Sequence, residues 1–334
     1  MPILAQKGRC LSLPRVLPSA MLTPTPVAIG GAFALVSALL VARSRRAALV
    51  PVLPPLRPTI LLFGDSITQQ SFGPGGWGAA LANTYQRTAD VCLRGYSGYN
   101  TRWALRVLPR VFPAGQGAAP ALVTVMLGAN DANIPAPIKG QAAAASRQFV
   151  PLEEYVANLR LIMRAVAHTG CARLLLITPP PVDTAAWHTT CVRDYGVPSD
   201  ADPNRSFEFT REYAEAVVQL GKETGTPTLD LHAAFLARPD WRECLRDGLH
   251  PNAAGGGLIG EAVLGAIVQH YPELQPAYFG NDGPERLAMD FPDHKEIDID
   301  GIDESFGAYE RKTLPARTAF ADKSEARRGA VKRA

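Results

Sequence analysis

The first 64 residues contain no Asp or Glu, although the whole chain contains 31. Seven of the 34 Lys and Arg residues lie in this acid-free stretch, so the remainder carries 27 basic against 31 acidic residues and is mildly acidic. Domains that bind nucleic acid are basic, with Lys and Arg clustered on one face. The charge distribution therefore argues against a nucleic-acid partner and separates a basic leader from a larger body.

Cysteine is scarce and irregularly spaced. The chain has five cysteines: Cys10, Cys92, Cys171, Cys191 and Cys244. Zinc sites and small disulfide-rich folds need paired or regularly spaced cysteines, so this pattern indicates neither kind of framework. We expect reduced, buried thiols.

A long apolar run occupies residues 27–42, interrupted only by Ser37 and followed by the basic segment Arg43–Arg46. Slightly extended, the run approaches the roughly 20 residues of a membrane-spanning helix. Three interpretations fit: a membrane anchor through residues 25–42, an organelle transit peptide, or a gene model that begins upstream of a real start at Met21. The first two predict a membrane-anchored or organelle-targeted protein, and the third predicts a cytoplasmic one.

Composition divides the rest of the chain. A Pro-rich stretch before residue 58 predicts a stiff linker, and 334 residues are enough for one large domain with extensions. After about residue 278 the periodicity ends, and an acidic stretch is followed by 24 residues that include eight Lys or Arg. We predict a leader at 1–57, a folded domain at 58–278 and a largely disordered extension at 279–334, whose acidic part docks on the domain.

Apolar runs and helical periodicity alternate through the body. Strands are predicted at 59–63, 90–94, 121–127, 173–178 and 227–231. Helices are predicted at 77–85, 152–168 and 251–270, with another that begins at Asp202–Pro203 and buries a stripe from Phe209 to Leu220. Continuous apolar strands between helices are typical of a parallel sheet covered on both faces. We therefore predict an α/β fold, a three-layer α/β/α sandwich with a five-stranded parallel sheet.

Polar residues follow several of these strands. In open α/β sheets the loops after the strands meet along one rim, where ligands bind. The polar groups in these loops are Gly64-Asp65-Ser66, Gly98, Asn130 and, before the last helix, Asp247–His250. Each alone is a common turn or cap sequence. Together and in this order they indicate an acyl-transfer site.

Each group has a role in such a site. Ser66 is the candidate nucleophile, because a serine hydroxyl beside a base can attack an ester carbonyl. His250 is the candidate base, and Asp247 would fix its tautomer and stabilise the imidazolium. The backbone N–H groups of Ser66 and Gly98 and the side-chain amide of Asn130 are candidate donors to the oxyanion. This chemistry requires no metal and no cofactor.

Neighbouring residues receive separate interpretations. Asp65 is predicted to be structural, its carboxylate holding the turn. Tyr99 and Arg102 are candidates for binding the substrate in the acyl pocket. The run 253–257 contains three glycines, each of which costs a helix interior about 1 kcal/mol relative to alanine. This run is therefore expected to loosen the loop that holds His250.

The blocks resemble those of the SGNH hydrolases, also called GDSL-type esterases and lipases: a GDS serine, a glycine, a G-x-N-D asparagine and a D-x-x-H pair. The segments GGWGAAL, LRGYSGYNTRWAL, VTVMLGANDA, LLLITPPPVD and CLRDGLHPN closely resemble the isoamyl acetate-hydrolysing esterase branch. The resemblance covers about residues 58–275. It implies a flavodoxin-like SGNH hydrolase fold and the same roles for the serine, histidine, aspartate, glycine and asparagine named above.

We therefore expect a carboxylic ester hydrolase that acts on a small-molecule ester through an acyl-enzyme. Small or short-chain acyl esters such as acetates are favoured, because no long hydrophobic insertion that could form a lipase lid occurs and the branch resemblance agrees. The same site would also suit O-deacetylation of a sugar or polysaccharide, or acyl transfer to an alcohol. A different class of function is an inactive domain that serves as a membrane-tethered binding module, which the intact set of five groups disfavours. The sequence predicts no oligomeric state.

Overall fold

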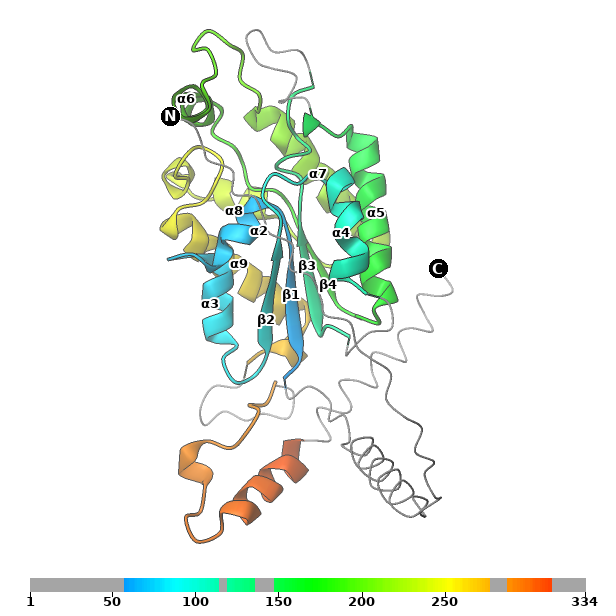
Figure 1. Cartoon of the computed structure of the whole chain (residues 1–334), viewed down its shortest axis with the longest axis vertical. Helices are drawn as coiled ribbons and strands as arrows, with labels where there is room; N and C mark the ends of the chain where they lie inside the picture. The colour runs from blue at the N-terminus through cyan, green and yellow to red at the C-terminus, as the bar shows by residue number, and fades with distance from the viewer. Residues whose placement is uncertain (1–56, 114–118, 136–146, 277–286, 314–334) are drawn as a thin grey trace, which may run out of the picture. The chain divides into compact units, whose positions relative to one another are not determined.

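The computed structural model describes residues 57–113, 119–135, 147–276 and 287–313 (Figure 1). The predicted membrane anchor at 25–42 and the basic end of the chain lie outside the described residues. Of the helices within the described ranges, none is long and apolar enough to cross a membrane.

Five parallel strands form one sheet in the order β2-β1-β3-β4-β5. The strands are β1 (Thr59–Gly64), β2 (Asp90–Gly95), β3 (Leu122–Met126), β4 (Leu174–Ile177) and β5 (Thr228–Leu229). Gly64 is in register with Gly95 on one side and with Met126 on the other, so three strands end level. The strand order reverses between β1 and β3, the switch point at which such sheets bind ligands.

Helices cover both faces of the sheet (Figure 1). On one face lie α3 (Trp77–Thr84), α8 (Leu231–Leu236) and α9 (Ala253–His270), and on the other lie α4 (Thr101–Val111), α5 (Leu152–His168) and α7 (Phe207–Thr224). Along β1, Ile60 and Leu62 belong to one core, and Leu61 and Phe63 belong to the other. Because both faces are covered, the strand has no polar alternation. The three-layer α/β/α prediction is confirmed.

Most predicted elements lie within two residues of the observed ones, and the helix at 152–168 has the predicted bounds. The start at Asp202–Pro203 is wrong: α7 begins at Phe207, because the Ser206 hydroxyl caps it by accepting a hydrogen bond from the N–H of Phe209 at 3.0 Å. The sequence did not predict α4, α8 or α6 (Thr184–Tyr195). Shorter helical turns are α2 (Ser66–Gln69), η1 (Gln70–Phe72), η3 (Trp241–Cys244), η4 (Pro272–Leu274) and η5 (His294–Glu296).

The glycine-rich run 253–257 forms the first turns of α9 and has a packing role. A Cβ on Gly256 would lie 2.1 Å from the carbonyl oxygen of Gly75, and one on Gly255 would lie 2.3 Å from that of Cys244. Both distances are too short for any real contact, so only glycine fits at either position. The expected loosening is therefore wrong, because two of the glycines let α9 pack closely against the preceding chain.

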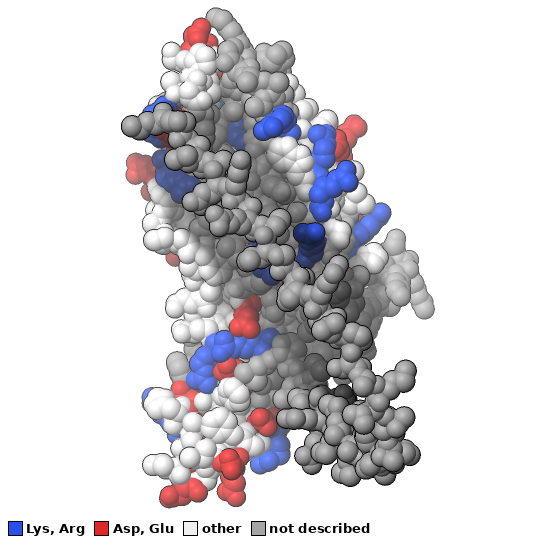
Figure 2. All heavy atoms as spheres, in the orientation of Figure 1, with Lys and Arg blue, Asp and Glu red and all other residues white. Residues whose placement is uncertain are grey.

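The acidic segment 287–313 contacts the body of the domain. Asp290 is buried, and its Oδ2 accepts a hydrogen bond from Arg57 Nε at 2.8 Å, while its Oδ1 lies 3.3 Å from Arg87 Nε. The segment also contains a helix at 302–313, which the prediction of a largely disordered extension did not include. Acidic side chains gather on this segment (Figure 2; the segment is orange in Figure 1).

The four described cysteines are free thiols. Cys171, Cys191 and Cys244 are buried, and Cys92 is partly buried. Three of the four therefore lie in the core, as expected of buried thiols, while Cys10 lies outside the described residues.

Candidate active site

Ser66 is the first residue of α2, immediately beyond the end of β1. Asp65 caps this short helix, because its Oδ1 accepts a hydrogen bond from the N–H of Ile67 at 2.9 Å. The Asp65 carboxyl is buried, and burial raises its pKa to about 6. The cap explains why the strand turns abruptly here and confirms that Asp65 is structural. The turn places Ser66 at the rim of the sheet.

The structure brings Ser66, His250 and Asp247 together. Ser66 Oγ lies 2.9 Å from His250 Nε2, and His250 Nδ1 lies 2.7 Å from Asp247 Oδ2. Burial alone would raise the pKa of Asp247, but the hydrogen bond and charge of His250 outweigh it and lower the pKa to about 2. An ionised carboxylate can only accept, so the neutral imidazole carries its proton on Nδ1. The lone pair on Nε2 therefore faces the serine hydroxyl.

The histidine loop is held at several points. Leu245 and Pro251 form an antiparallel bridge across it, and Asn252 caps α9 directly after it. The indole of Trp187 in α6 lies edge-on to the His250 ring, with 6.1 Å between the ring centroids. These contacts fix the backbone and the ring, so the orientation of the imidazole does not depend on Asp247 alone.

Two of the three predicted oxyanion donors lie in the loops after β2 and β3. Gly98 has a φ of 78°, a left-handed conformation that favours glycine. The amide of Asn130 is fixed by three hydrogen bonds: Nδ2 donates to Tyr99 O at 2.9 Å, and Oδ1 accepts from Gln148 Nε2 and Arg205 Nη2 at 3.1 Å each. Gln148 Nε2 also donates to Gly98 O at 2.8 Å. One glutamine thus links Gly98 and Asn130.

Asp131 lies buried beneath the same loop. Its Oδ1 accepts hydrogen bonds from the N–H of Thr101 at 2.9 Å and from the Thr101 hydroxyl at 2.5 Å. Its Oδ2 is buried without a hydrogen-bond partner among the described residues. Burial raises the pKa of Asp131 to about 7. The carboxyl joins the end of β3 to the start of α4 and so supports the loop that carries Asn130.

The two residues predicted to bind substrate have other contacts. Arg102 donates to both carboxylate oxygens of Glu154, at 2.7 and 2.6 Å, in an exposed ion pair between α4 and α5. The Tyr99 ring packs near Tyr96 and Trp103, with centroids 5.3 and 6.1 Å away. The geometry gives Arg102 no support as a substrate ligand, whereas Tyr99 is tied to the site through its carbonyl group.

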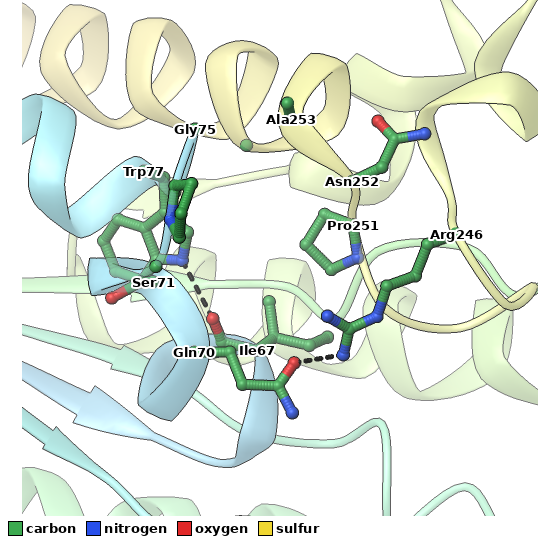
Figure 3. A pocket seen from close by; sticks show the side chains of 13 residues that line it. Ile67, Gln70, Ser71, Gly75, Trp77, Arg246, Pro251, Asn252 and Ala253 are labelled. Carbon is green, nitrogen blue, oxygen red and sulfur yellow. Dashed lines mark hydrogen bonds between the residues drawn. The ribbon is translucent and has the colours of Figure 1, made fainter.

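A cavity of about 360 Å³ is lined by the residues that follow the serine and the histidine, Ile67 and Pro251 (Figure 3). The indole of Trp77 adds a further apolar wall, and its Nε1 donates to Ile67 O at 3.1 Å. Arg246 and Gln70 point toward each other at its edge and form a hydrogen bond (Figure 3). The cavity therefore combines apolar walls with one polar edge. Within the described ranges, no three His, Cys, Asp or Glu side chains gather so that they could hold a metal ion.

The chain is similar to a known family and to several known proteins. The model of the GDSL-like Lipase/Acylhydrolase family matches residues 62–257, more than half of the chain. The chain belongs to this family. A GDSL esterase/lipase of Arabidopsis thaliana is 40% identical over 245 residues, which cover 73% of this chain and 95% of the plant protein. An isoamyl acetate-hydrolyzing esterase 1 homolog of Bos taurus is 42% identical over 210 residues, covering 62% of this chain and 80% of the bovine protein.

Among solved structures, the lipase/acylhydrolase from Enterococcus faecalis is 22% identical, with a TM-score of 0.49. The match covers 64% of this chain and 96% of that chain. Family membership and the esterase relatives confirm the resemblance stated from the sequence, and they identify this GDSL-family chain as a carboxylic ester hydrolase.

Three residues beside the site of this GDSL-family protein were missed by sequence reasoning: Gln148, Trp187 and Arg205. Each contacts a site residue that is distant in the sequence. None lies directly after a strand or at a recognisable spacing from the serine, glycine, asparagine and histidine motifs. The mistaken helix start at Asp202 also hid the arginine, because it placed that residue inside a helix. A lone basic residue in the loop Pro203–Ser206 was the available signal, and it was weak.

Proposed function

We propose that this GDSL-family hydrolase cleaves small or short-chain acyl esters, with acetates as the favoured class, through a covalent acyl-enzyme on Ser66. The observation that carries the proposal is the continuous hydrogen-bonded row from Asp247 through His250 to Ser66, with distances of 2.7 and 2.9 Å. A serine hydroxyl in this position has a base within reach, and the base is oriented by a carboxylate.

In the first half of the reaction, His250 Nε2 takes the proton of Ser66 as Oγ attacks the ester carbonyl. The carbonyl oxygen becomes an oxyanion that accepts hydrogen bonds from the N–H groups of Ser66 and Gly98 and from Asn130 Nδ2. Each such donor contributes roughly 10²–10³-fold in rate. The intermediate collapses, the bond to the alcohol oxygen breaks, and the departing alcohol takes the proton from His250.

In the second half, water replaces the alcohol. His250 Nε2 takes a proton from this water as its oxygen attacks the acyl carbonyl, and a second oxyanion forms against the same donors. Collapse releases the carboxylic acid and returns the proton to Ser66 Oγ. Asp247 remains ionised throughout and stabilises each imidazolium.

One observation supports a small ester. The mammalian relatives with about 40% identity carry a name that refers to isoamyl acetate, an ester with a two-carbon acyl group. The cavity of about 360 Å³ lies beside the triad, and its lining includes neither Ser66 nor His250, so its volume does not set the size of the substrate.

The test uses the full chain with p-nitrophenyl acetate and a fluorophosphonate probe. Wild type should hydrolyse the ester and be labelled, Ser66→Ala should do neither, and the control Ser199→Ala, at an exposed serine, should match wild type. If wild type and Ser66→Ala are equally inert to both reagents, the domain is a binding module and the proposal fails.

Substrate class is settled by a second set of reactions. A series from acetate to palmitate esters should peak at short chains, and a peak at palmitate would overturn the size assignment. Faster turnover of acetylated polysaccharide, or preferential acyl transfer to an added alcohol, would instead assign the same site to deacetylation or transfer.

We also propose that the leader through residues 25–42 anchors or targets the enzyme. Imaging of fluorescent fusions with and without residues 1–50 tests this proposal. An identical distribution of the two fusions would contradict it.

A further inference from the structure

We propose that Arg205 and Gln148 are positioning residues, which hold the oxyanion donors Asn130 and Gly98 in their reactive orientation. This inference rests on the proposed ester hydrolysis at Ser66. It assigns a role to the hydrogen bonds of Gln148 and Arg205, two residues that take no direct part in the proposed reaction.

The amide of Gln148 is fully engaged. Its Nε2 donates to Gly98 O at 2.8 Å and to Asn130 Oδ1 at 3.1 Å, while its Oε1 accepts from Arg205 Nη2 at 3.1 Å and from Asn133 Nδ2 at 3.3 Å. Both donors point to acceptors and the oxygen faces two donors, so the amide has one favourable orientation. Gln148 therefore fixes the separation between the loop after β2 and the loop after β3.

Arg205 contacts the same oxygen of Asn130 as Gln148 does. Its side chain is only 3% exposed, Nη1 donates to Ala129 O, and Nη2 donates to Asn130 Oδ1 at 3.1 Å. The guanidinium lies over the indole of Trp187, 5.7 Å from the ring centroid, and its Nε is buried without a hydrogen-bond partner among the described residues. Burying a cation with an unsatisfied donor is costly, so its contacts with the asparagine loop need an explanation beyond stability.

The contacts have a direct consequence for Asn130. With two donors on Oδ1, a flipped amide would bring its own N–H₂ group against the donors of Arg205 and Gln148, so Nδ2 stays on the side of Tyr99. Nδ2 has two N–H bonds, of which one goes to Tyr99 O and the other is available to a substrate oxygen. A charged donor on Oδ1 also polarises the amide and strengthens that second N–H as a donor to a developing negative charge.

The first test measures kcat and KM for p-nitrophenyl acetate in Gln148→Met and Arg205→Lys. Because the oxyanion forms after substrate binds, each variant should lose about 10–100-fold in kcat with KM within about twofold of wild type. The matched controls Gln219→Met and Arg160→Lys, whose side chains contact Glu223 on an exposed surface, should retain wild-type values. Equal kcat in wild type and in folded Gln148→Met would overturn the inference.

A double-mutant cycle tests whether the effect passes through the asparagine. In an Asn130→Ala background, Arg205→Lys should change kcat by less than about twofold, because the group that it positions is absent. Independent, multiplicative losses would overturn the positioning role and leave Arg205 purely structural. If Arg205→Lys does not fold, judged by its thermal melt, the cycle uses the partly buried Gln148→Met. Its loss in kcat should then be smaller in the Asn130→Ala background than in wild type, and the remaining loss reflects the contact with Gly98. An equal loss in both backgrounds would overturn the positioning of Asn130.

These measurements distinguish a failure of the proposed hydrolysis from a failure of the positioning role. An inert wild type that also escapes fluorophosphonate labelling would overturn the proposed hydrolysis, and the positioning role with it. An active wild type with unchanged Gln148→Met and Arg205→Lys would overturn the positioning role alone.

Discussion

Asp247 holds His250 at two points, the ring and the backbone. Its Oδ2 lies 2.7 Å from Nδ1 of the imidazole, and its Oδ1 accepts a hydrogen bond from the N–H of the same residue at 2.7 Å. One carboxylate thus sets the tautomer of the ring and closes the turn that carries it.

Replacing this carboxylate by an amide should separate the two effects. In Asp247→Asn the amide oxygen can still close the turn, but its N–H₂ group would face Nδ1 and favour the unreactive tautomer. We expect kcat for p-nitrophenyl acetate to fall roughly 10³–10⁴-fold, the scale known for this substitution in serine proteases. Retention of kcat within tenfold would show that Trp187 and the loop orient the ring without the carboxylate.

Gly256 and Gly257 offer a matched pair in α9. Gly256→Ala should destabilise the protein by at least about 2 kcal/mol, because its Cβ would lie 2.1 Å from the carbonyl oxygen of Gly75. Gly257→Ala should instead stabilise it by up to about 1 kcal/mol, since no atom lies within 4 Å of its Cβ. Urea unfolding of both variants measures the difference. Equal effects would contradict the packing role assigned to the glycine run.

The buried carboxyl of Asp131 should make stability depend on pH. Its pKa is raised from 3.8 to about 7, so the native state keeps a proton that the unfolded chain releases, and stability falls as pH rises from 3.8 to 7. Asp131→Asn lacks this titration, so its free energy of unfolding relative to wild type should rise between pH 4 and pH 8, by on the order of 3 kcal/mol. Urea unfolding across this range, with the exposed Asp303→Asn as control, measures the change. A difference that stays constant with pH would show that Asp131 is ionised at pH 4.

The contact between Asp290 and Arg57 should hold the segment 287–313 on the domain. Burial alone would raise the pKa of Asp290, but the hydrogen bond and charge of Arg57 lower it, so the contact stabilises above pH 3.8 and weakens as pH falls further. Asp290→Asn should accelerate amide hydrogen exchange in the segment by about tenfold, which corresponds to about 1.4 kcal/mol. Asp303→Asn is the control, and equal exchange in both variants would contradict the assignment.

The sequence predicted the parts of the fold that rest on local pattern. The strand at Thr59–Gly64 is buried on both faces and the helix at Leu152–His168 is buried along one, so each pattern of side chains identifies its element. Ser66 and Asn130 could be placed at one rim because each directly follows a strand of a parallel sheet.

The features that were not predicted from the sequence depend on contacts between segments that are distant in the chain. Arg205 contacts Asn130 across 75 positions, and nothing in its immediate sequence indicates that partner. The start of α7 was misplaced because Asp202–Pro203 and Ser206 are both acceptable caps, and only the tertiary structure selects the serine. The glycines of α9 looked costly because helix propensity takes no account of the neighbouring backbone.

Ser66 and His250 meet across 184 positions of the chain, although their side chains are 2.9 Å apart. The nucleophile is synthesised early and its base late, so we expect a nascent chain to remain inert until the segment that carries His250 has been synthesised and has packed against the domain. Reaction with a fluorophosphonate would then mark the moment at which the domain is complete. Labelling of Ser66 over time would therefore measure how fast the domain folds.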